Sequence, residues 1–443
     1  MQGENENPQQ LRAGYARRRI TSLAIGLITL FIMGLIFAWS IFATPIANDT
    51  GWDPMMLSQN FRIVMICQAV GCIFSSLIQR RFHGEPRIPI IIGGVMVIAG
   101  FALCGVCSSW GVVSVFVFYG GVAAMGAGIS FNAILTTVNL WFPDRVGFIS
   151  GLQMFAFGVA SLIFGVMLDG FMNTIGWQLT LVGLGAVICA LNIVAAAIIK
   201  APPINIDEIF PSKSVGQAAE KSSSVVEAAK NPHYKTDFCV SKKQFTTTQM
   251  LKTPVFWIGL FWFICVASIG LTLIGESRQD ALSLGTEATL ATLLVGTVSL
   301  FNGGMSIVYG LLLDRFGIVN HLRLMSGVSL VGICIVAAAF AVQSSPMFIV
   351  GALVVAMGYG GLPVFSTTFT LNRYGRQYYS TNCAIGTAFL VPASLASMVL
   401  APVFMGSGGL GEMYTGFVGV MILALAVLVV FIRRYRKEMS QLV

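Results

Sequence analysis

Runs of about twenty apolar residues recur along the whole chain, and they restrict its possible folds more than any other feature. A helix that crosses a hydrocarbon core of about 30 Å needs roughly 20 predominantly apolar residues. Lipid offers no hydrogen-bonding partner, so each run has to satisfy its backbone groups internally. The pattern therefore predicts an all-α integral membrane protein with about twelve transmembrane helices, at 21–43, 57–78, 88–108, 112–140, 147–168, 177–199, 254–275, 289–313, 322–342, 346–371, 380–404 and 414–432.

The charged residues predict how these helices are oriented. Only 10% of the 443 residues are charged, and the mean hydropathy is +0.83, whereas soluble proteins carry about 25% charge. With twelve spans, 24 of the 26 Lys and Arg residues fall on the side that holds both termini; Arg62 and Arg278 are the exceptions. Because basic residues are enriched in cytoplasmic loops, we expect a multi-pass protein of the cell membrane with both termini in the cytoplasm. The net charge of +8 then reflects topology, and no nucleic-acid partner is expected.

A polar stretch divides the chain in two. Residues 200–253 are rich in Lys, Ser and Thr and include Pro202, Pro203 and Pro232, a composition that cannot bury a core. We expect a cytoplasmic linker there, with short surface helices. The predicted organisation is a cytoplasmic tail (1–20), a six-helix half (21–199), the linker (200–253), a second six-helix half (254–433) and a second tail (434–443).

The two halves echo each other at matching loops. The loop after the eighth span reads YGLLLDRFG (309–317), and the loop after the second reads SSLIQRRFHG (75–84). Two six-helix repeats with basic loops, and G-x-x-x-D-R-x-G at 310–317, resemble the major facilitator superfamily. The resemblance implies that Asp314 and Arg315 belong to a charge network that locks the cytoplasmic side, and Gly310 would let helices approach closely. The alternative is a solvated charge pair that only sets topology. Arg80 and Arg81 stand where the first-half copy would carry its acidic residue.

Further segments resemble one branch of that superfamily, the oxalate/formate antiporters, which are related to the monocarboxylate transporters. These segments are FAWSIFATPI (37–46), PRIPIIIGG (86–94), NLWFPDRVGFISG (139–151), MLKTPVFW (250–257) and FNGG (301–304). The resemblance implies secondary transport of a small organic anion. It also implies two cations that hold a dicarboxylate, but the matching positions are Ser306 and Leu390. Oxalate is therefore not the expected substrate, because a dianion without cations in a low-dielectric cavity is unfavourable.

Polar residues recur on one face of the helices that surround the cavity in this fold. Asn302 and Ser306 are four residues apart in the eighth span, and Asn132 lies in the fourth. We expect them to offer neutral hydrogen bonds to the substrate; the alternative is hydrogen bonding between helices. The resemblance also implies a cavity lined by the aromatic residues Phe37, Phe131 and Tyr359, for which the alternative is ordinary apolar packing.

Two charged residues near the outer ends of spans complete the candidate site. Arg62, a turn or two into the second span, is predicted to attract an anion, unless it merely extends its guanidinium toward the interface. Glu276, near the outer end of the seventh span, is the candidate proton carrier. The three histidines, His83, His233 and His321, fall in predicted loops.

These observations favour a secondary transporter of a small organic anion, a monocarboxylate, acting by antiport or proton symport with alternating access. One alternative is an exporter of neutral or lipophilic compounds, and another is a transport-fold receptor or sensor. The sequence contains neither a GxxxxGK[ST] loop nor a recognisable nucleophile–base pair. We therefore expect no enzymatic activity, no cofactor and no metal, and we expect the chain to function as a monomer.

Overall fold

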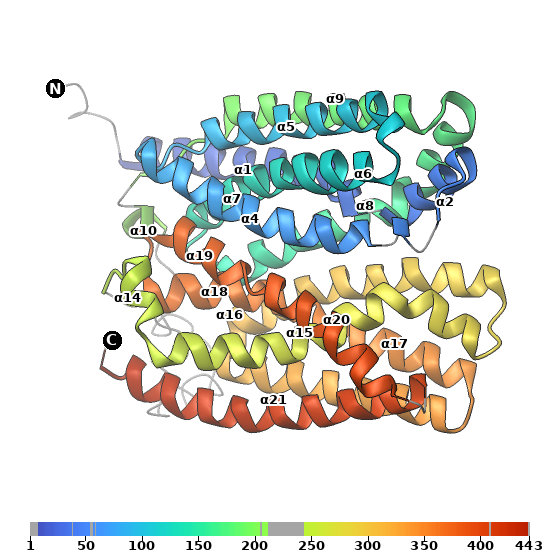
Figure 1. Ribbon diagram of the computed structural model, residues 1–443. Helices are drawn as coiled ribbons and strands as arrows, with labels where there is room; N and C mark the ends of the chain where they lie inside the picture. Colours follow the sequence, from blue (N-terminus) through green and yellow to red (C-terminus); the bar gives the residue numbers. More distant parts are fainter. Residues whose placement is uncertain are drawn as a thin grey trace.

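The computed structural model describes residues 8–37, 39–53, 56–57, 59–203, 206–210, 243–406 and 409–441, and this part of the chain is helical throughout. Helices in the first part of the chain pack above those of the last part in Figure 1, with their axes roughly parallel. The start of α1 and the end of α21 lie on the same side of the molecule. We call this side the terminal face and the other side the opposite face.

The first half comprises the helices up to α9. These are α1 (Pro8–Met33), the 3-10 helix η1 (Gly34–Phe37), α2 (Trp39–Thr50), α4 (Asn60–Arg81), α5 (Arg87–Val106), η2 (Ser108–Trp110), α6 (Val112–Ser114), the π-helix η3 (Val115–Ala123), α7 (Ala124–Trp141), α8 (Val146–Ile175) and α9 (Trp177–Ile198). Two short helices follow, α10 (Ile206–Ile209) and α14 (Thr247–Leu251).

The second half begins with α15. It comprises α15 (Pro254–Ser283), α16 (Ala288–Ala341), α17 (Ser345–Tyr359), α18 (Gly361–Tyr374), α19 (Tyr379–Thr387), α20 (Leu390–Met405) and α21 (Leu410–Met439).

The described residues contain twelve membrane crossings. Eleven helices are long and apolar enough to cross a membrane, but one of them, α16, is 54 residues long. It is two helices joined at Gly317, whose φ of 79° and ψ of 171° are not helical. Glycine adopts this left-handed backbone region without the penalty that a Cβ brings. The expected number of transmembrane helices is confirmed, and the loop after the eighth span is a sharp turn at Gly317.

Buried apolar side chains form two large clusters. One draws almost entirely on residues 30–206 and the other on residues 245–439. Ala384 of α19 belongs to the first cluster, so α19 reaches across to the first half. A small third cluster of Val146, Leu371, Tyr379 and Cys383 joins the start of α8 to α18 and α19. The two halves are therefore in contact close to the terminal face.

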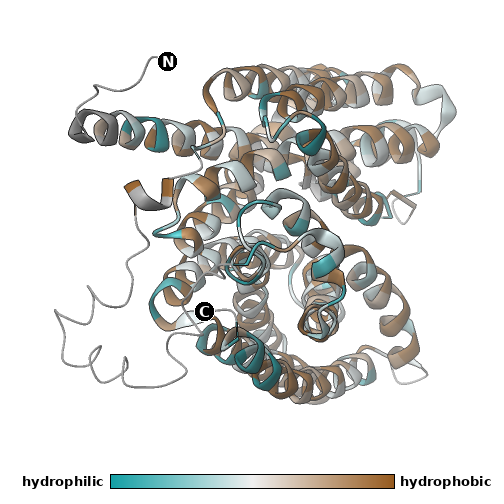
Figure 2. Ribbon diagram, turned by 90° about the vertical axis from the view of Figure 1, so that its left-hand side faces the viewer, coloured by the Kyte–Doolittle hydropathy of each residue, from teal (hydrophilic) through white to brown (hydrophobic). Residues whose placement is uncertain are grey.

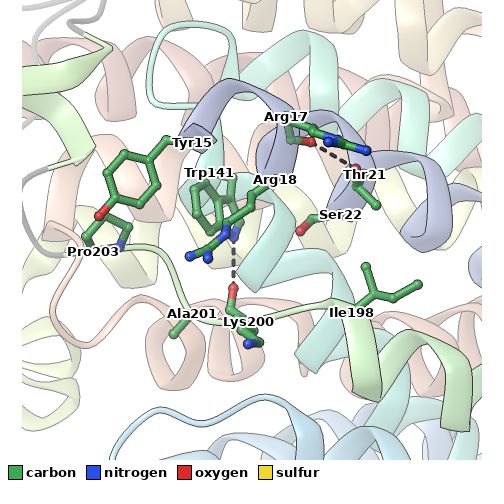
Figure 3. A pocket seen from close by; sticks show the side chains of 10 residues that line it. All are labelled: Tyr15, Arg17, Arg18, Thr21, Ser22, Trp141, Ile198, Lys200, Ala201 and Pro203. Atoms are coloured by element: carbon green, nitrogen blue, oxygen red, sulfur yellow. Dashed lines mark hydrogen bonds between the residues drawn. The ribbon is translucent and has the colours of Figure 1, made fainter. Parts of the chain in front are cut away.

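The ends of the polar stretch between the halves contact the helices. In the first half, Trp141 donates a hydrogen bond from Nε1 to the carbonyl oxygen of Lys200 at 2.8 Å, beside a cavity of about 380 Å³ that also involves Tyr15 and Arg18 of α1 (Figure 3). In the second half, Asn382 donates to the carbonyl of Phe245 at 3.0 Å. The expected short helices are α10 and α14, whereas 211–242 lie outside the described residues.

Candidate functional site

The carboxylate of Asp314 joins the two halves at the terminal face. Oδ1 accepts a hydrogen bond from the backbone N–H of Gly147 at 2.9 Å, and Oδ2 accepts one from Phe148 at 2.7 Å. These N–H groups belong to the first turn of α8, which begins at Val146. The first N–H groups of a helix have no partner within the helix and carry the positive end of its dipole. Asp314 of the second half thus caps a helix of the first half.

Glycines allow the backbones to come this close. A Cβ at Gly310 would lie 2.3 Å from the carbonyl oxygen of Gly147, and one at Gly151 would lie 2.2 Å from that of Ser306. Any side chain larger than hydrogen at these positions would separate α8 from α16. The expected role of Gly310 in close helix packing therefore agrees with its position.

Arg315 lies apart from this contact. Its side chain is exposed, and its guanidinium carbon is 5.4 Å from the ring centroid of the neighbouring Phe316. Of the two residues predicted to act together, the structure brings Asp314 to the interface and leaves Arg315 outside it.

The corresponding loop of the first half has no such carboxylate. Arg80 and Arg81 are both exposed, and His83 adopts a φ of 54° close to the place where the second half has Gly317. The turn is thus retained while the acidic residue is missing. Of these two loops, only the one in the second half caps a helix of the other half within the described residues, and it does so through Asp314.

A second charged contact lies beside the first. Arg376, between α18 and α19, donates a hydrogen bond from Nη2 to the carbonyl oxygen of Leu140 at 2.5 Å, in the last turn of α7. Burial lowers the pKa of Arg376 to about 10, so the guanidinium remains charged at neutral pH. Cations are favoured at the carbonyl end of a helix and anions at the amide end. Arg376 and Asp314 therefore match the end of α7 and the start of α8 respectively.

Neutral hydrogen bonds continue the contact into the membrane. Asn139 of α7 donates to Oη of Tyr379 at 3.0 Å and accepts from Nε2 of Gln153 at 2.9 Å. About two helical turns deeper on the same face of α7, Asn132 donates to Oγ of Ser380 at 3.3 Å. All but Ser380 are buried. The polar face predicted on the fourth span thus contacts α19 of the other half.

The predicted polar residues of the eighth span have a different environment. Ser306 is 3% exposed and donates to the carbonyl oxygen of Gly360 at 2.8 Å, so its hydroxyl links α16 to the junction between α17 and α18. Asn302 is half-buried, and its backbone carbonyl lies against Gly360. For Ser306, the contacts agree with the alternative of hydrogen bonding between helices.

Two of the three predicted aromatic residues pack on neighbouring helices. Phe131 packs on Phe157 with ring centroids 4.9 Å apart. The ring of Tyr359 covers Gly270 of α15, where a Cβ would lie 2.3 Å from its Cδ2. The side chain of Phe37 lies outside the described part of the structure.

Arg62 and Glu276 form an ion pair between the halves, near the opposite face. Nη2 of Arg62 in α4 lies 3.8 Å from Oε1 of Glu276 in α15, and the two side chains are 39% and 35% exposed. The guanidinium also donates a hydrogen bond from Nη1 to Oε1 of Gln59 at 2.8 Å. The predicted anion-attracting residue and the predicted proton carrier are thus direct partners, a pairing the sequence did not reveal. Arg278, by contrast, donates to Thr292 at 3.2 Å within the second half.

Sequence reasoning missed a buried carboxylate next to this pair. Asp280 lies one helical turn after Glu276, is 2% exposed, and accepts a hydrogen bond from the hydroxyl of Tyr414 in α21. The i, i+4 spacing of two acidic residues at the end of an apolar run is the signal that could have found it. A line of charged and polar groups therefore runs from Arg62 through Glu276 toward α21.

Two further ion pairs at the terminal face were also missed. Arg19 contacts Asp144 at 2.5 Å, and Arg373 contacts Glu438 at 2.6 Å. Each lies within one half, so they strengthen the halves rather than the contact between them.

The chain is similar to known proteins over most of its length. A sequence model of the family described as the Major Facilitator Superfamily matches residues 23–389. An oxalate:formate antiporter from Oxalobacter formigenes is 26% identical over 399 residues, which cover 85% of this chain and 88% of that protein. The uncharacterised MFS-type transporter YhjX from Escherichia coli strain K12 is 24% identical over 372 residues, which cover 83% of this chain and 84% of that protein.

Solved structures resemble the fold. A proton:xylose symporter bound to 6-bromo-6-deoxy-D-glucose superposes with a TM-score of 0.67 at 14% identity, covering 92% of this chain and 95% of that one. The fucose:proton symporter of Escherichia coli gives a TM-score of 0.63 at 13% identity, covering 94% and 99%. At these identities the likeness concerns the fold alone.

Proposed function

This chain belongs to the major facilitator superfamily, and from that premise we propose that it carries a small organic anion, a monocarboxylate, across the membrane by antiport or by proton symport. The superfamily consists of transporters, so the predicted fold and the expectation that the chain is not an enzyme are confirmed. The antiporter named for oxalate and formate supports an organic anion as the substrate class.

The observation that carries the proposal is the ion pair of Arg62 and Glu276 between the halves. A guanidinium offers a planar pair of donors that fits a carboxylate. Its present partner is itself a carboxylate that can take up a proton. When Glu276 is protonated, Arg62 loses its counter-charge and an incoming carboxylate replaces it.

This exchange keeps the net charge of the site constant. One proton and one monoanion enter together, so the site is equally charged before and after loading. In antiport, a second anion leaves the site as the first one binds, so the charge of the site is again unchanged. A dianion would bring one negative charge too many, because Ser306 and Leu390 supply no positive charge. The charge balance therefore favours a monocarboxylate.

We further propose that the terminal face is cytoplasmic and is closed in this structure. The distribution of Lys and Arg supports the orientation. Asp314 and Arg376 supply the contacts that have to break before the site can open to that side. Alternating access would then exchange these contacts for those at the opposite face.

The same ion pair is also compatible with the alternative of a neutral or lipophilic substrate. Arg62 already has a carboxylate partner, so an uncharged compound could pass without disturbing any charge. The two hypotheses differ in the effect that removal of Arg62 should have on uptake.

Uptake of a panel of labelled acids and neutral compounds into proteoliposomes tests the proposal. In Arg62→Gln, we expect the half-saturating concentration for a monocarboxylate to rise roughly tenfold or more, since hydrogen bonds to charged groups contribute about 1.5–3 kcal/mol. Arg278→Gln is the matched control, because it removes the same charge from α15 without touching the pair. Equal uptake of all acids by Arg62→Gln and wild type would reject the anion role and favour the neutral substrate.

A further inference from the structure

A cavity of about 880 Å³ opens on the outer side of the second half, between α16 and α21. It begins at the terminal face and is lined by residues of about the last four turns of α21. Arg323 and Gly327, which follow the turn at Gly317, line it from α16. It does not involve the contact between the halves, so it is separate from the proposed transport site. Binding cavities for small molecules commonly enclose about 300–1,000 Å³, so this one can hold a ligand of appreciable size.

Four basic side chains converge on the mouth of this cavity: Arg323, Arg433, Arg436 and Lys437. Among the described residues, no acidic side chain lines it. The acidic residue closest in sequence, Glu438, instead contacts Arg373 at 2.6 Å and Arg434 at 3.1 Å, and neither of these lines the cavity. The mouth is therefore strongly positive.

The inner part of the cavity is apolar. Leu425, Leu428, Val429 and Ile432 follow one another at helical spacing along α21. From Leu425 to Lys437 are twelve residues, or roughly 18 Å of helix at 1.5 Å per residue. The cavity thus changes from hydrocarbon-like to cationic over about the depth of one leaflet. Figure 2, which faces the terminal side, shows hydrophilic residues gathered where α21 ends and hydrophobic ones before them.

The enrichment of basic residues in loops on one side explains positive charge but not a cavity. Arg80 and Arg81 of the first half are exposed basic residues of that ordinary kind. At the end of α21, the charges instead surround a hollow whose deeper wall is apolar. A basic pocket between membrane helices is the arrangement that binds anionic lipid head groups.

We propose that this cavity binds one anionic phospholipid of the leaflet at the terminal face. Its phosphate lies among Arg323, Arg433 and Lys437, and an acyl chain runs along Leu425 and Val429. The lipid then connects α21 to the second part of α16, whose first part carries Asp314. The proposal does not depend on which substrate is transported.

Native mass spectrometry of the purified full-length chain tests the binding, with phosphatidylglycerol, phosphatidylcholine and inorganic phosphate as separate probes. We expect wild type to retain phosphatidylglycerol and not phosphatidylcholine. Arg433→Gln with Lys437→Gln should bind phosphatidylglycerol about 30-fold more weakly, given roughly fivefold for each cation near the surface. Arg80→Gln with Arg81→Gln, which removes the same charge from the first half, should bind like wild type.

A second variant guards against loss of folding in the first. Val429→Trp keeps every charge and fills the inner part of the cavity, so it should also lose the lipid, whereas Arg433→Lys should retain it. Equal lipid retention by wild type and both cavity variants would overturn the proposal. It would also be overturned if both lipids bound equally, or if inorganic phosphate alone displaced phosphatidylglycerol, which would indicate an anion site without a role for the acyl chain.

Discussion

At the scale of single residues, the ion pair of Arg62 and Glu276 is the contact on which the proposed coupling depends. The two side chains come from α4 and α15, are each about one-third exposed and lie 3.8 Å apart. Their separation in sequence is more than two hundred residues, so no local pattern could have paired them. Sequence reasoning identified each residue from its position near the end of a span, and only the packing of the halves joins them.

Glu276→Gln tests the titratable partner. The amide cannot take up a proton, so we expect uptake of a monocarboxylate to lose its stimulation by a pH gradient, while exchange of anions continues. The other ionisable groups nearby, Arg62, Arg278, Asp280 and Tyr414, are unchanged in this variant. Uptake at several external pH values measures the effect, with Glu287→Gln, an exposed acidic residue at the start of α16, as control. A pH dependence identical to wild type would assign the proton to another group.

Tyr414→Phe tests the buried carboxylate. It leaves Asp280, which is 2% exposed, without the hydroxyl that donates to it. An unsatisfied buried polar group costs about 1–3 kcal/mol, so we expect a lower melting temperature for the purified protein. Tyr15→Phe, at a half-buried tyrosine of α1, is the comparison. If both variants melt at the wild-type temperature, the hydrogen bond contributes nothing measurable to stability.

At the scale of helices, the start of α8 and the turn in α16 form one contact. Sequence analysis predicted the roles of Gly310 and Asp314 from a family motif and grouped Arg315 with them. The contact explains why only the carboxylate reaches α8, because a helix start presents N–H groups, which bind an anion and repel a cation. Among the described residues Arg315 makes no ion pair, and its side chain is exposed, so its place in a charge network stays a prediction.

Asp314→Asn should weaken the closed terminal face. Loss of the charge facing a helix start removes about 1–2 kcal/mol, which corresponds to roughly a 5- to 30-fold change in the ratio of open to closed molecules. Cys383 is a natural reporter, because it is buried in the cluster that joins the halves. In a variant without the other cysteines, we expect a membrane-impermeant maleimide to label Cys383 faster from the terminal side. Unchanged labelling, or an equal increase in Arg315→Gln, would contradict the role of Asp314.

Gly310→Ala tests the close approach of the backbones. The added Cβ would lie 2.3 Å from the carbonyl oxygen of Gly147, and a backbone atom cannot move aside as a side chain can. We expect the same rise in Cys383 labelling together with a lower melting temperature. Gly304→Ala is the matched control on the same helix, because nothing lies within 4 Å of its added Cβ. Equal behaviour of the two variants would mean that α8 and α16 do not need this contact.

At the scale of the whole molecule, the sequence predicted the twelve crossings because lipid imposes both a length and a composition on every span. It could not predict what each polar residue faces. Ser306 was expected to face substrate and instead bonds to Gly360, because glycines bring α16 and α18 together. His321 was expected in a loop, but it is 1% exposed and packs on Tyr309 with ring centroids 5.2 Å apart. That expectation was wrong, since α16 resumes directly after Gly317 and carries His321 into the core.

The central claim is that the molecule carries a monocarboxylate either together with a proton or in exchange for another anion, through one site. Proteoliposomes that contain a pH-sensitive dye report the internal pH while labelled monocarboxylate added outside reports its own uptake. We predict saturable uptake matched either one-to-one by internal acidification or by the exit of a preloaded anion. Dicarboxylates and neutral compounds should not be taken up. Transport of a neutral compound in vesicles that take up no monocarboxylate, whatever the pH gradient or preloaded anion, would contradict the account.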